Sequence, residues 1–275
     1  SWRMGLEPQR ETYRPPWLLW VVAALAILVG GLSLYREVTG QNDGSDLRAD
    51  SRLAPAYQAQ LLEAARTAYA ILRTPEFAAA LTGAAGDQPI YVSRDRGERT
   101  AESVLEDLTG RGRYLPVQLI MMDPAAAQSG WHYAAGGGLG YVSQDGEIHL
   151  PPDVLADWAA DDLVRRSCAV NTLAHEIAHT ISISPFVFTP AFTDTRLGER
   201  AIPRRGEGDS PVASYLIGSA AQCAWLQQQG RIAASEVGAC VEVFGARGFN
   251  DRCAAFTAGE PVQERPGLPP PMRPL

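Results

Sequence analysis

Residues 171–182, NTLAHEIAHTIS, decide what fold and what site the sequence predicts. They hold two of the chain's four histidines, His175 and His179, and Glu176 directly follows the first. Residues four apart on an α-helix lie on the same face, about one turn apart, so both imidazoles can reach one metal ion. Glu176 is turned about 100° from His175 and flanks that position. The alternative is that two histidines share a helix and bind nothing.

The His-Glu-x-x-His spacing resembles the signature of the zincin superfamily of zinc metallopeptidases at His175, Glu176 and His179. The match covers five residues and their setting on a predicted helix, after a sheet and before a second helix. The resemblance implies a zincin-like domain with a long active-site helix that carries the motif and a second helix that faces it. It also implies Zn²⁺ as the cofactor, bound by both histidines and a third ligand, with one position left for water.

The third metal ligand is expected to be acidic, because no histidine follows His179 and Ser182 stands where the longer zincin motif has glycine. An antiparallel partner helix brings its N-terminus close to the motif, which favours Asp209 at the mouth of that helix. A carboxylate there can instead cap the helix. Asp194, in PAFTDT, is the second choice, and only one ligand is expected. Two further acidic residues in the same segment stay open as candidates, Glu199 and Glu207.

The predicted reaction is hydrolysis of a peptide bond by a zinc-activated water, with Glu176 as general base. Tyr215 is a candidate donor to the developing oxyanion, against the simpler view that it is a half-buried core tyrosine. The strands around Tyr141 and Ile148 are expected to offer an edge to an extended peptide.

Hydrophobic spacing around the motif predicts an α+β domain over residues 53–258, with a small and mostly antiparallel sheet. Thr74 and Pro75 mark the start of one helix, and Asp145-Gly146 marks a hairpin turn. The helices are expected at 53–73, 74–83, 100–110, 161–181, 210–230 and 234–248. Strands are expected at 89–93 and 115–122 and in a hairpin that ends at Leu150.

The apolar run at residues 17–35 predicts a transmembrane helix, because about 19 residues span a bilayer core of roughly 30 Å. The arginines that precede it predict a cytoplasmic tail at residues 1–16. The run is longer than the apolar core of a cleaved signal peptide, and it lacks the polar face of a buried helix. We therefore expect a single-pass protein of the inner (plasma) membrane, with its catalytic domain periplasmic or extracellular. A linker is expected at 36–52 and a disordered proline-rich tail at 259–275.

Composition excludes several classes of function. The net charge of −7 gives no electrostatic reason to bind nucleic acid. The chain contains no lysine, which excludes a P-loop lysine, a Schiff-base lysine and a Ser-Lys dyad.

The four cysteines predict two disulfides if the domain is translocated into an oxidising compartment. Three connectivities are open, and the preferred one joins Cys168 to Cys223 and Cys240 to Cys253. A nucleophilic Cys168 is the reactive alternative.

The sequence therefore predicts a membrane-anchored zinc metallopeptidase that cleaves a peptide or protein substrate. One alternative is a catalytically inactive zincin-like domain that binds a peptide or a cell-envelope partner. Another is a structural anchor with an incidental motif.

Overall fold

The structure, a computed structural model, describes residues 16–39, 46–86, 88–93, 96–122, 133–135, 146–184, 188–193, 200–201, 203–204, 207–209 and 213–246. Its contacts divide the chain into two units, residues 1–40 and 41–275. The tail expected at residues 259–275 lies outside the described residues, as does nearly all of the N-terminal tail.

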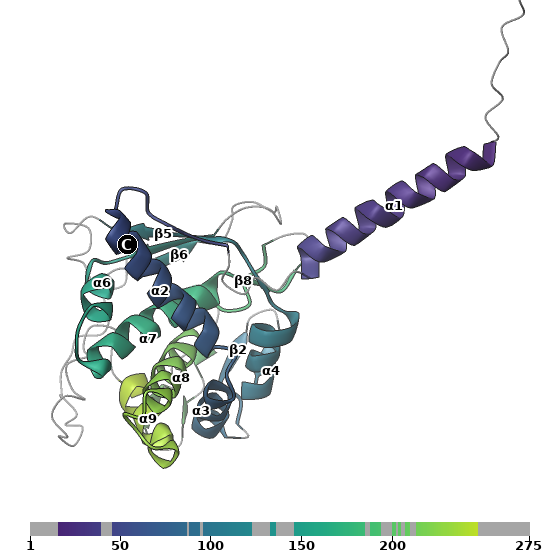
Figure 1. The fold of residues 1–275 in the computed structure, drawn as a ribbon. Helices are drawn as coiled ribbons and strands as arrows, with labels where there is room; N and C mark the ends of the chain where they lie inside the picture. The colour runs from purple at the N-terminus through teal and green to yellow at the C-terminus, as the bar shows by residue number, and fades with distance from the viewer. Residues whose placement is uncertain are drawn as a thin grey trace, which may run out of the picture. The chain divides into compact units, whose positions relative to one another are not determined.

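The first unit contains helix α1 (Pro16–Thr39), where the sequence predicts the transmembrane helix at residues 17–35 (Figure 1). Several large apolar side chains of α1 are exposed, among them Trp20 and Ile27. Nowhere in the described part of the chain is there a helix with the length and apolar character needed to cross a membrane.

The first two helices of the second unit each begin at a proline. Helix α2 (Pro55–Ile71) has proline in its first turn. Helix α3 (Pro75–Ala85) begins as predicted, with the Phe77 amide donating to the Thr74 hydroxyl at 3.2 Å. Its predicted end at residue 83 is wrong, because the chain leaves the helix at Gly86, where φ is +59° and glycine is favoured.

The helix expected at residues 100–110 is divided into two parts. Helix α4 (Ala101–Glu106) is capped by Thr100, whose hydroxyl accepts from the Ser103 amide. It continues as a π-helical turn, η1 (Asp107–Arg111). Gly112 follows, and a Cβ there would lie 1.9 Å from the Asp107 carbonyl oxygen, so only glycine fits this close approach.

The largest sheet has four strands in the order β1 (Leu47–Ala49), β5 (Val117–Met121), β7 (Gly146–Leu150) and β6 (Tyr133–Ala135). The pairs β1–β5 and β5–β7 are parallel, and only β6–β7 is antiparallel. The prediction of a mostly antiparallel sheet is therefore wrong for this sheet. The chain between β5 and β7 forms β6 on the far side of β7, so β5 and β7 run in the same direction.

The antiparallel strands predicted to end at Leu150 are confirmed as β6 and β7, but the predicted turn at Asp145-Gly146 is wrong, and the strand expected around Tyr141 lies outside the described residues. Gly146 lies inside β7, opposite Val117 of β5, instead of in a turn with Asp145, which is outside the described residues. Ile148 pairs with strands on both sides and is fully buried, so β7 is not the free edge that the sequence suggested. The edge strands of this sheet are β1 and β6.

Short antiparallel strands join distant segments around this core. Strand β2 (Tyr91–Ser93) pairs with β3 (Gly97–Arg99) and with β9 (Arg200–Ala201). Strand β4 (Arg113–Tyr114) pairs with β8 (Ile181–Ser182), and β10 (Pro203–Arg204) pairs with β11 (Glu207–Asp209).

Helix α7 (Leu163–His179) lies at the centre of the helical layer, in contact with α2, α6 (Asp153–Trp158) and α8 (Ala213–Gln228) (Figure 1). Helix α8 also packs on α3 and on α9 (Val237–Ala246), which follows the short 3₁₀ turn η3 (Ala234–Glu236). These contacts confirm an α+β fold, with α7 held on several sides.

Candidate metal centre

Helix α7 presents the motif in its last two turns. The Val164 amide donates to the Asp162 carboxylate at 3.0 Å, which caps the helix near its predicted start. The predicted end at residue 181 is wrong, because Ile181 and Ser182 leave the helix to pair with β4. His179 is therefore the last helical residue, at a point where the chain turns into a strand.

The two imidazoles converge. The Nε2 atoms of His175 and His179 lie 3.2 Å apart. Two nitrogen ligands in a tetrahedral zinc site are separated by about 3.3 Å, given zinc–nitrogen distances near 2.05 Å. A carboxylate oxygen of Glu176 lies 3.7 Å from the His175 Nε2, and the ligand atoms of the three residues all lie within 4.8 Å of one another. These residues could hold a metal ion.

Two of the three residues in this cluster are more deeply buried than ionisable side chains usually are. His175 is 2% exposed and Glu176 is 3% exposed, while His179 is half-buried. Acidic and imidazole groups are costly to bury unless they are hydrogen-bonded, charged in pairs or bound to metal. The alternative of one buried and one exposed histidine with unrelated roles does not describe this pair, because their ring nitrogens face each other.

A backbone carbonyl sets the orientation of the His179 ring. The Nδ1 of His179 lies 3.1 Å from the Phe192 carbonyl oxygen. Because a carbonyl only accepts, Nδ1 carries the proton in this contact, which leaves the Nε2 lone pair directed at the shared position. Metal-binding histidines are commonly oriented in this way. The position of a backbone carbonyl cannot be recognised from a sequence pattern, so Phe192 was not among the predicted site residues.

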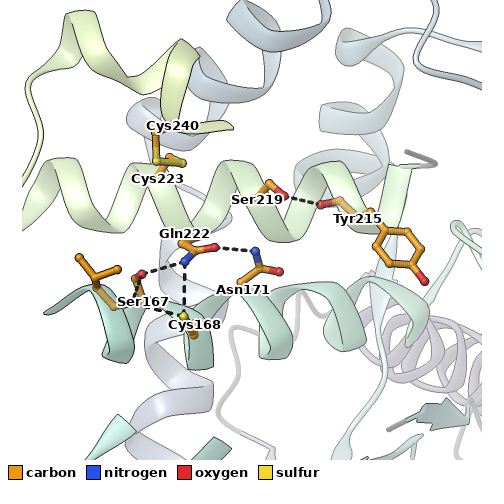
Figure 2. The surroundings of a disulfide bond; sticks show 9 residues. Ser167, Cys168, Asn171, Tyr215, Ser219, Gln222, Cys223 and Cys240 are labelled. Carbon is orange, nitrogen blue, oxygen red and sulfur yellow. Dashed lines mark hydrogen bonds between the residues drawn. A yellow bond between two sulfur atoms is a disulfide. The ribbon is translucent and has the colours of Figure 1, made fainter. Parts of the chain in front are cut away.

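Helices α7 and α8 run antiparallel, as the sequence predicts, and approach closely (Figure 2). A Cβ on Gly218 would lie 2.5 Å from the Asn171 side-chain oxygen and 2.9 Å from the Asn171 carbonyl oxygen. The Asn171 side-chain amide donates to Gln222 at 2.6 Å, and the Gln222 amide donates to Ser167 at 2.9 Å. This buried polar network fixes the register of the two helices below the site.

That register places Tyr215 beside His175, one of the two candidate metal ligands on α7. The Tyr215 ring meets the His175 ring edge-on, with 4.6 Å between the ring centroids. Tyr215 lies in the first turn of α8 and is partly exposed.

The structure describes two of the four candidates for the third ligand. Asp209 ends strand β11, four residues before α8 begins at Ala213. Glu207 begins the same strand. Asp194 and Glu199 lie outside the described residues.

The cysteines pair differently from the prediction. Cys223 is bonded to Cys240, which joins α8 to α9 (Figure 2). Gln222, not Cys223, faces Cys168 across the helix pair, and its amide nitrogen lies 3.7 Å from the Cys168 sulfur. Consecutive helical residues are turned about 100°, so Cys223 points toward α9. Cys168 is itself in a disulfide, which excludes it as a nucleophile.

Comparisons with protein-family models, with curated proteins and with solved structures found no match to this chain.

Proposed function

We propose that this protein is a zinc-dependent metallopeptidase. One observation carries the proposal: the Nε2 atoms of His175 and His179 face each other at 3.2 Å from successive turns of α7, beside the buried carboxylate of Glu176. A binding module has no need of a base at that position.

Zinc in this position would activate a water molecule and polarise the substrate carbonyl. Glu176 takes the proton from the attacking water and then passes it to the leaving amine. Its burial keeps the carboxylate at one place and close to the His175 ring. Tyr215, which packs against that ring, is proposed to donate to the developing oxyanion.

We propose an acidic third ligand, and chain connectivity makes Asp194 the first to test. Asp194 follows Phe192 by only two residues in the sequence. The Phe192 carbonyl is itself in contact with His179. Asp209, which the sequence favours, lies four residues before α8 begins at Ala213, and this connection is longer than the two residues from Phe192 to Asp194. Asp194→Ala and Asp209→Ala, compared by zinc content, distinguish the two, because only the true ligand lowers it.

The substrate is proposed to be an extended peptide that pairs with edge strand β6. Among the sheet strands, β6 lies against α7, and it pairs with β7 along one side. Addition of a strand at such an edge supplies backbone hydrogen bonds to a substrate of varied sequence. We further propose that α1, with its exposed apolar side chains, attaches the protein to the inner membrane and leaves the catalytic domain outside the cytoplasm. Fractionation of cells and protease accessibility test this location.

The test of activity is cleavage of casein by the purified full chain, with and without a chelator. Glu176→Gln is expected to abolish cleavage while zinc content is retained, because the amide cannot take a proton. Glu242→Gln, on the exposed face of α9, is the matched control and should cleave normally. Chelator-resistant cleavage, or full activity of Glu176→Gln, would refute the proposal. Zinc binding without any cleavage would favour the inactive peptide-binding domain.

A further inference from the structure

An ion-paired arginine outside the motif reaches the segment that orients His179. Arg96 lies at the turn between β2 and β3, and one terminal nitrogen of its guanidinium, Nη1, donates to the Asp107 carboxylate at 2.5 Å. The other, Nη2, donates to the Ala191 carbonyl oxygen and to the Tyr91 hydroxyl. Asp107 is 2% exposed, so the guanidinium is held from a buried anchor.

The backbone carbonyls of the consecutive residues Ala191 and Phe192 accept hydrogen bonds from two different side chains. The Ala191 amide donates to the Ile181 carbonyl at 2.8 Å, and its own carbonyl accepts from Arg96. The next carbonyl, that of Phe192, accepts from the His179 Nδ1. The peptide that links the two residues is planar, so a displacement of the Ala191 carbonyl is transmitted to the backbone of Phe192.

We propose that Arg96 is a positioning residue of the metal centre. It holds the Ala191 carbonyl, and thereby holds the Phe192 carbonyl where it fixes the ring of His179. This inference rests on the proposed metal site, and it assigns a role to a residue that lies 83 positions before His179. The ring of His179 is oriented from two sides: by α7 through its backbone and by the Arg96-anchored segment through Nδ1.

Arg99 supplies a matched control. Its Nη2 also donates to the Asp107 carboxylate, at 3.1 Å, and its other contact is the Ser103 carbonyl at 3.3 Å. In Arg96→Lys and Arg99→Lys a positive charge stays beside Asp107, so both variants are designed to keep the buried carboxylate paired. A lysine ammonium paired with Asp107 lacks the second terminal nitrogen of a guanidinium. Arg96→Lys therefore loses the hydrogen bond that Arg96 Nη2 donates to the Ala191 carbonyl.

The experiment uses the full chain and measures the Kd for Zn²⁺ by competition with a chromogenic chelator. The visible absorption of the Co²⁺-loaded protein and the Tm of the metal-free and zinc-loaded forms are recorded in parallel. The Co²⁺ spectrum reports ligand geometry, which a general loss of stability would not alter.

Arg96→Lys is expected to raise the Kd for Zn²⁺ about 10-fold, the lower end of the effect of groups that orient metal ligands, because it acts through a peptide. The Co²⁺ spectrum should change and the gain in Tm on zinc binding should shrink. Arg99→Lys should leave both unchanged. If Arg96→Lys binds zinc as tightly as the wild type, the role of Arg96 is overturned and the metal site is not. If both variants lose zinc affinity equally, the role of Arg96 is also overturned, because the loss then reflects a general effect of Asp107. Absence of zinc binding by the wild type overturns the metal site and this role with it.

Discussion

Gly218→Ala probes the close approach of α7 and α8 that places Tyr215 beside His175. The new Cβ would lie 2.5 Å from the Asn171 side-chain oxygen and 2.9 Å from its carbonyl oxygen. Ordinary carbon–oxygen contacts begin near 3.4 Å, so the helices must separate by roughly 0.5 to 1 Å. The Asn171 side chain cannot simply turn away, because its amide is bonded to Gln222 at 2.6 Å.

Overpacking of this kind costs about 1–3 kcal/mol, and it outweighs the gain of up to about 1 kcal/mol from alanine in a helix. We therefore expect a net loss near 1 kcal/mol in the free energy of unfolding, which is a fall in Tm of about 2–4 °C. Gly83→Ala, in α3, is the matched control, since its Cβ would meet nothing within 4 Å and should stabilise the protein. Urea unfolding of both variants measures the difference. Equal stabilisation by the two substitutions would refute the close helix contact.

The remaining predictions concern an ion pair and a disulfide. Hydrogen bonds from the Arg52 side chain hold the pKa of Asp50 at about 2, below its usual 3.8. A depressed pKa stabilises the fold above the unfolded value and loses that effect as the pH falls through the folded value. Asp50→Asn should therefore lower the free energy of unfolding by about 2 kcal/mol at pH 7 and much less near pH 2, and equal losses at both would contradict this. Replacing Cys223 and Cys240 together by serine removes a disulfide that spans 17 residues of sequence. The double variant should have a free energy of unfolding lower by about 3 kcal/mol, measured by urea unfolding. An unchanged urea midpoint would show that the disulfide contributes nothing to stability.

Features that depend on neighbours in the sequence were predicted well. Thr74 and Thr100 cap the helices that follow them, since a cap requires only a hydroxyl and an amide a few residues later. The pairing of His175 and His179 follows from the helical repeat alone. The antiparallel partner helix was also predicted correctly, and it approaches α7 at Gly218, where there is no room for a side chain.

Features that depend on distant segments were not predicted. The direction of β5 relative to β7 depends on where β6 is inserted, and alternation of apolar residues carries no information about it. The disulfide partner of Cys223 depends on which face of α8 meets α9. The contacts of the Phe192 carbonyl with His179 and of Arg96 with the Ala191 carbonyl depend on the path of the loop that follows α7.

The proposed function requires that α7 bind a metal ion through His175 and His179. Elemental analysis of the purified full chain, after removal of loosely bound metal, tests it most directly. We predict about one equivalent of zinc in the wild type and nearly none in His179→Ala, since two of the expected ligands come from this pair. Wild-type protein without zinc, or His179→Ala with the full amount, would contradict the account.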